Sequence, residues 1–185
     1  MSAIPLPKRP SQGVPCTDPQ AVAQVGHRLL EALCHHPGAE VIVLCVGTDR
    51  QTGDALGPLV GTQMERQGQC QVIGTLRAPL HARNLLARTT GVGGPGQVVV
   101  VVDAAVGPPG QVGEISVRPT GLRPRAGVGA GLPVVGQIAV TGTVTSDPAA
   151  LGAVRLGAVA EMAAVIASAL AGAIARRGSA TRMAA

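Results

Sequence analysis

Residues 40–61 read EVIVLCVGTDRQTGDALGPLVG, and this stretch decides the fold. Its first part is a continuous apolar run rich in β-branched residues, which predicts a strand buried on both faces. The Gly-, Thr- and Asp-containing segment after it predicts a loop that leads into a helix near Asp54. In open α/β sheets, ligands bind at the carboxyl ends of the strands, so Asp49 and Asp54 are placed for function rather than packing.

A second apolar stretch supplies a partner for the first. Residues 97–107 read QVVVVVDAAVG and form the most hydrophobic strand candidate in the chain. The apolar run ends at Asp103, and small residues and a Gly-Pro-Pro-Gly turn follow it. If the two strands are neighbours, Asp54 and Asp103 meet at one rim of the sheet.

These residues resemble the YyaC-type spore proteins, which are related to germination protease and, more distantly, to hydrogenase maturation endopeptidases. The main motif is GTDRQTGDALGPLVG at 47–61. The resemblance continues through GTL at 74–76, PLHARNL at 79–85, VDA at 102–104, AGVG at 126–129, LPVVG at 132–136 and VTGTV at 140–144. It covers roughly residues 39–175.

The resemblance implies a three-layer α/β/α fold with a mostly parallel central sheet and an endopeptidase-like site. Asp54 and Asp103 match the two aspartates of the germination protease pattern. The metal-dependent relatives use a histidine downstream of the second acidic residue, whereas all four histidines here precede Asp103. We therefore expect a carboxylate mechanism without metal or cofactor, and a metal-assisted hydrolase is the third hypothesis.

The remaining elements alternate between helix and strand. We predict a Pro-rich disordered arm at 1–17, one domain at 18–177 and a flexible tail at 178–185. The predicted helices are 18–33 with Asp18 as N-cap, 53–67, 81–88, and 148–175 with Asp147 as N-cap. The predicted further strands are 71–76, 114–118 and 137–144. The Gly/Pro/Arg-rich segment 119–136 fits equally a substrate-contacting loop or a plain connection.

Composition narrows the classes of function. The chain has 185 residues, no Phe, Tyr or Trp, and a net charge of +5. We predict no nucleic-acid binding, because no known DNA- or RNA-binding motif is present and no aromatic ring can stack on bases. The chain lacks a secretory signal and C-x-x-C spacing, and the Ala-rich C-terminal run predicts a docked helix rather than a membrane span, so we expect a cytoplasmic protein. The sequence gives no indication of the oligomeric state.

Two aspartates at one rim predict acid–base chemistry, because two close carboxylates do not ionise together easily. One would keep its proton while the other activates a water for attack on a peptide carbonyl. The alternative is that Asp54 caps a helix and Asp103 binds loop amides.

Three further residues are candidate supporting groups. Thr48 and Asp49 lie in the loop, where Asp49 also fits a turn-forming residue. His81 begins a short helix, where it fits a hydrogen-bond donor, a proton shuttle, a metal ligand or an ordinary capping histidine.

We expect a sporulation-associated endopeptidase that acts on a protein substrate. The runner-up is a non-catalytic binding or adaptor protein on a protease-like fold.

Overall fold

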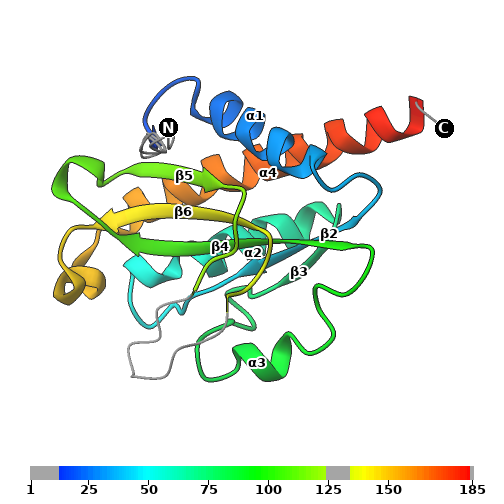
Figure 1. Ribbon diagram of the computed structural model, residues 1–185. Helices are drawn as coiled ribbons and strands as arrows, with labels where there is room; N and C mark the ends of the chain where they lie inside the picture. Colours follow the sequence, from blue (N-terminus) through cyan, green and yellow to red (C-terminus); the bar gives the residue numbers. More distant parts are fainter. Residues whose placement is uncertain (1–12, 124–133, 184–185) are drawn as a thin grey trace, which may run out of the picture.

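A mixed sheet of six strands forms the centre of the computed structural model, which describes residues 13–123 and 134–183 (Figure 1). The strand order is β1-β5-β6-β4-β2-β3. The strands are β1 Val14–Pro15, β2 Glu40–Cys45, β3 Gln71–Ile73, β4 Gln97–Val106, β5 Glu114–Arg118 and β6 Ile138–Thr145. Strands β3, β2, β4 and β6 are parallel, and β5 and β1 add antiparallel pairs at one edge. The predicted α/β class is confirmed, and the sheet is mixed, with three parallel and two antiparallel strand pairs.

The helices connect the strands in the order that the sequence predicted. They are α1 Ala21–Cys34, α2 Leu56–Gln67, α3 Leu85–Arg88 and α4 Leu156–Met183, with short 3-10 helices at Gly53–Ala55, Pro109–Gln111 and Pro148–Ala153. The valine runs form the two central parallel strands β2 and β4, which are buried on both faces because segments cover the sheet from both sides.

Helices α1, α2 and α4 cover one face of the sheet and form the main core (Figure 1). Gly26 of α1 lies against Ala169 of α4, where a Cβ on the glycine would be 3.5 Å from the alanine carbonyl oxygen. Small residues thus let these two helices approach closely, and aliphatic side chains fill the core without aromatic rings. The largest fully buried side chains of this cluster are Leu29, Leu33, Leu56, Met64, Ile115, Ile138, Ile166 and Leu170.

The opposite face carries a smaller apolar cluster. It is formed by strands β2 and β4 together with Leu80 and Leu85 from the loop before α3 and from α3 itself. In Figure 1, α3 lies on the side of the sheet away from α1 and α4. The two helical layers are therefore unequal, and the smaller one covers the β2–β4 half of its face.

Helix α4 is long and apolar enough to cross a membrane by length and composition alone, with a mean hydropathy of 1.9 over an 18-residue window within Leu156–Ser179. In the structure, its inner face packs against α1 and α2 and buries residues such as Ile166 and Leu170. The core helix of a soluble protein passes the same test, so the finding is weak support for a membrane span.

The boundaries of the fold differ from the predicted ones at both ends. Val14 is buried and pairs with Ile115, so the ordered structure starts before residue 18; residues 1–12 lie outside the described part. At the other end, α4 continues to Met183, past the boundary predicted at residue 178. The centre of the segment 119–136 also lies outside the described residues, and its ends pair at Leu122 and Val135.

Two helix starts needed correction. The helix predicted from Asp18 begins at Ala21, because the Asp18 carboxylate accepts a hydrogen bond from the Gln20 amide (2.7 Å) in the turn before it. Asp147 is an N-cap as predicted, since it accepts from the Ala149 amide at 2.9 Å, but it caps a separate 3-10 helix rather than α4.

Candidate active site

The loop after β2 folds back onto Asp54 and holds it at the start of α2. The Thr48 amide donates to the backbone oxygen of Asp54 at 3.1 Å and to its carboxylate Oδ2 at 3.0 Å. Gly47 has a φ of +141°, and a Cβ there would lie 2.0 Å from the Asp54 carbonyl oxygen. Only glycine permits this approach, so the sequence GTDRQTGD fixes where the Asp54 carboxylate lies.

Asp103 lies within β4 rather than at its end, because the strand continues to Val106. Side chains alternate along a strand, so Asp103 lies on the same face as Val99 and Val101, opposite to α1, α2 and α4. It is only 9% exposed, and its Cα partner on β6 is Thr141.

The structure brings Asp54 and Asp103 together, as predicted. Burial raises the pKa of Asp103 to about 8, the negative charge of Asp54 adds to the rise, and a hydrogen bond from the Ala104 amide opposes it. Burial also raises the pKa of Asp54, against the Thr48 amide and the charge of His81, which lower it. Asp103 therefore holds its proton at neutral pH, and Asp54 is the better candidate for the ionised partner.

His81 lies close enough to Asp54 for its charge to lower the pKa of that carboxyl. Its loop is tied down, because the His81 amide donates to Asn84 Oδ1 at 2.8 Å and the Gly47 amide donates to the Leu80 carbonyl at 2.8 Å. The helix predicted at 81–88 is helical only over Leu85–Arg88, since the turn around Asn84 replaces its first residues. The structure therefore places His81 in the site, next to Asp54.

The other two candidate residues, Thr48 and Asp49, contribute less to the site. Thr48 contributes its backbone amide to Asp54, and its Oγ1 accepts weakly from the Arg50 amide at 3.4 Å. Asp49 is exposed. Among the hydrogen bonds of the described residues, none joins the Asp49 side chain to either aspartate, which fits a residue of the loop surface.

Sequence reasoning missed a group of buried threonines beside the aspartates. Thr141, Thr143 and Thr145 of β6 are all buried. They occupy every second position of the strand, where hydrophobic residues are expected in a covered parallel sheet. The signal that could have found them is the alternation TGTVT within an otherwise apolar strand.

The donor set does not fit a metal ion. Within residues 13–123 and 134–183, no three His, Cys, Asp or Glu side chains are grouped so that they could hold one. The segments 1–12, 124–133 and 184–185 contain none of these residue types. We therefore derive no step through a metal.

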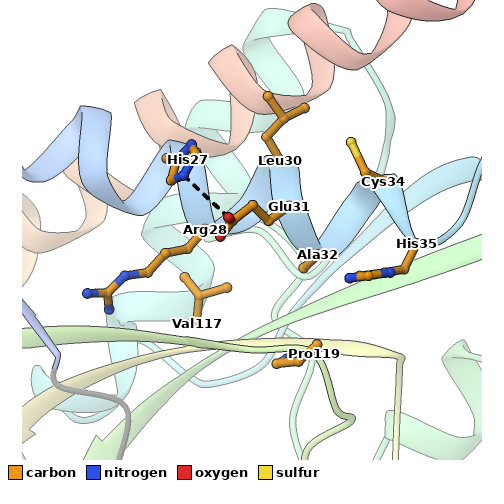
Figure 2. A pocket seen from close by; sticks show the side chains of 9 residues that line it. All are labelled: His27, Arg28, Leu30, Glu31, Ala32, Cys34, His35, Val117 and Pro119. Atoms are coloured by element: carbon orange, nitrogen blue, oxygen red, sulfur yellow. Dashed lines mark ion pairs between the residues drawn. The ribbon is translucent and has the colours of Figure 1, made fainter.

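Two hollows on the surface of the described residues lie away from the aspartates, and neither is lined by Asp54 or Asp103. The larger one, about 670 Å³, is a shallow groove between α1 and β5, lined among others by Leu30, Val117 and Pro119. Figure 2 shows the ion pair at its rim between His27 and Glu31, whose Nε2 and Oε1 are 3.4 Å apart. This groove belongs to the helix-covered side of the molecule and is separate from the aspartates.

The fold and the site define an α/β protein that carries a buried carboxyl group, Asp103, beside a partly buried one, Asp54, near the carboxyl ends of parallel strands. The chain belongs to the family described as "Protein of unknown function (DUF1256)", whose model matches residues 14–169. It is 35% identical over 171 residues to the "Uncharacterized protein YyaC" of Bacillus subtilis (strain 168), an alignment that covers 88% of this chain and 83% of the relative. The YyaC-type family assignment is thus confirmed, and the match includes the residues of β1.

Proposed function

We propose that this protein is an endopeptidase in which Asp54 and Asp103 hydrolyse a peptide bond of a protein substrate. The observation that carries the proposal is the burial of Asp103 beside Asp54, which raises the pKa of Asp103 to about 8. A buried carboxyl that keeps its proton at neutral pH, next to one that can lose it, is the pairing that acid–base catalysis requires.

The different surroundings of the two carboxyls assign their roles. Asp54 accepts a hydrogen bond from the Thr48 amide and lies near His81, and both contacts favour its ionised form. Ionised Asp54 takes a proton from water as the oxygen attacks the peptide carbonyl carbon. Asp103 gives its proton to the amide nitrogen as the carbon–nitrogen bond breaks, and the proton held by Asp54 returns to Asp103 through solvent.

The protease assignment rests on the resemblance of residues 47–61 and 102–104 to the germination protease pattern. By the same resemblance we propose a role in the cytoplasm of a sporulating cell. His81 would stabilise the ionised form of Asp54, and no cofactor takes part in this scheme.

A second candidate is a binding or adaptor protein that keeps the scaffold without turnover. It is favoured by one observation from the sequence: all four histidines precede Asp103, so the histidine that the metal-dependent relatives place downstream of the second acidic residue is missing.

Terminal-peptide mass spectrometry separates the two candidates. A lysate of sporulating cells is treated with the wild-type protein, with Asp54→Asn, with Asp103→Asn, and with Asp147→Asn as a control for the same substitution at an exposed aspartate. We expect new peptide termini with the wild type and with Asp147→Asn, and none with either variant of the pair.

The absence of new termini with folded wild-type protein across a range of pH would overturn the peptidase proposal and favour the binding protein. Termini that persist in Asp103→Asn would exclude its role as the acid. Addition of a chelator tests the metal-assisted alternative, since the carboxylate mechanism predicts the same termini with and without it.

A further inference from the structure

Two buried threonines of β6, Thr141 and Thr143, lie beside Asp103, and we call them the polar strip. The two-aspartate mechanism does not use their hydroxyl groups. Thr141 is 5% exposed and Thr143 is 8% exposed, so both side chains are buried in the sheet. Thr141 pairs with Asp103 and Thr143 pairs with Ala105 along the β4–β6 seam. Neighbouring strands are about 4.8 Å apart, so Thr141 and Asp103 are adjacent residues on the same face of the sheet.

The two hydroxyls have no hydrogen-bond partner in the part of the chain that the structure describes. Among residues 13–123 and 134–183, no hydrogen bond involves Thr141 Oγ1 or Thr143 Oγ1. In the same part of the chain, no fully buried side-chain oxygen or nitrogen is left without a partner. The two hydroxyl oxygens are therefore not completely sealed from solvent, and their hydrogen-bonding capacity is unused by the described residues.

Packing on the other face fixes the direction of the strip. A Cβ at Gly142 would lie 2.2 Å from Met162 Sδ and 2.6 Å from Leu56 Cδ2, so β6 is pressed against α2 and α4 at this point. Because side chains alternate along a strand, Thr141 and Thr143 point to the face that carries Asp103. They cannot turn into the main core.

We propose that the hydroxyls of Thr141 and Thr143 form the binding strip for the neutral peptide groups of an extended polypeptide, next to the carboxyl of Asp103. This inference rests on the proposed function for its catalytic part. A hydroxyl both donates and accepts hydrogen bonds, which suits the N–H and C=O of a peptide group. Strands β4 and β6 contain no basic residue, and the negative charge of Asp54 disfavours an anion.

Thr145 supplies a control within the same strand. Its hydroxyl donates to the Asp147 carbonyl at 3.3 Å and accepts from the Asp147 amide at 3.1 Å, so it is already used in a turn. The strip consequently includes Thr141 and Thr143 and excludes Thr145. A peptide ligand should therefore contact Thr141 and Thr143 but not Thr145.

The test is a titration of methyl-labelled threonines in the full chain, followed by NMR, with acetyl-triglycine amide as the probe. We expect saturable shifts of the Thr141 and Thr143 methyl signals and no shift at Thr145. Thr141→Val should weaken binding about fivefold, the loss of roughly one hydrogen bond, while Thr141→Ser should retain it. A parallel titration with inorganic phosphate should leave the signals unchanged.

The binding proposal would be overturned if the peptide probe did not shift the methyl signals of Thr141 and Thr143, or if phosphate shifted them more strongly. This readout does not depend on cleavage, so wild-type protein that binds the probe and cleaves nothing would contradict the peptidase alone. Unchanged cleavage by Thr141→Val and Thr143→Val would contradict peptide binding by these hydroxyls. It would leave the proposed catalysis by Asp54 and Asp103 unaffected. If the protein does cleave, Thr141→Val should lower kcat/KM at least tenfold, and Thr141→Ser should restore most of it.

Discussion

The two faces of the sheet are built from the same strands but differ in chemistry. One face packs β2, β4, β5 and β6 against three helices through apolar side chains. The other has a small apolar cluster at β2 and β4, and it also carries the buried polar side chains Asp103, Thr141 and Thr143. The difference teaches that stability is concentrated on the helix-covered face, so the other face can keep buried polar groups for function.

The largest expected effect is on the helix-covered face at Gly57. A Cβ there would lie 2.0 Å from the backbone oxygen of Val46, so Gly57→Val must separate α2 from the sheet. We expect no cooperative unfolding transition in denaturant. Gly172→Ala is the control, because a Cβ at that helical glycine meets nothing within 4 Å, and we expect it to be neutral or stabilising by up to about 1 kcal/mol. Normal stability of Gly57→Val would contradict the close packing of α2.

The next effect compares a core residue with a strip residue. Ile166→Ala removes a fully buried side chain of α4 and should lower the free energy of unfolding by about 2–5 kcal/mol. Thr141→Val keeps the volume and removes a hydroxyl without a partner in the described part, so it should cost less than about 1 kcal/mol. Urea unfolding of both variants measures the difference. Equal losses in the free energy of unfolding would mean that the two faces of the sheet contribute equally to stability.

A third effect concerns pH. The pKa of Asp103 is raised by burial to about 8 in the folded protein, above its value of about 3.9 in an unfolded chain. Between these values the folded state binds more protons than the unfolded state, so stability falls as pH rises from about 4 to about 8. Asp103→Asn should remove this part of the decline, worth on the order of a few kcal/mol, and should be the more stable protein at pH 8. A decline that is the same in both proteins would contradict the buried, protonated carboxyl.

The smallest effect belongs to an aspartate in the opposite environment. Asp147 is exposed and caps the 3-10 helix Pro148–Ala153. Asp147→Ala should destabilise the protein by about 1 kcal/mol, the usual value of a lost N-cap, while Asp147→Asn should cost less because asparagine also caps. Thermal unfolding compares the two. A loss as large as that of Ile166→Ala would contradict the minor structural role of this end of the sheet.

Much of the fold could be predicted from the apolar runs. Strand β5 was predicted at its observed bounds, and β2, β4, β6 and α2 within a few residues, because their periodicity and their Gly or Pro boundaries are strong local signals. The edge strand Val14–Pro15 could not be predicted, because two residues in a Pro-rich segment carry no pattern of their own. Their pairing depends on β5, which lies a hundred residues away in the sequence.

The site could be predicted in part. The positions of Asp54 and Asp103 after two apolar runs indicated that they meet, and His81 was a candidate that the fold places near Asp54. Thr141 and Thr143 were missed because a threonine in a strand usually reflects β propensity. Only the register of β6 against β4 shows that they adjoin Asp103.

The central claim is that partly buried Asp54 and buried Asp103 share one site, in which Asp103 keeps its proton at neutral pH. The most direct test is a titration of the aspartate side-chain carboxyl carbons by NMR, in the wild type and in Asp54→Asn. We predict that Asp103 titrates at a pKa of about 8 in the wild type and at a lower pKa in Asp54→Asn, where the neighbouring charge is absent. An Asp103 signal that titrates near its ordinary pKa of about 4, or one that is unchanged by Asp54→Asn, would contradict the account.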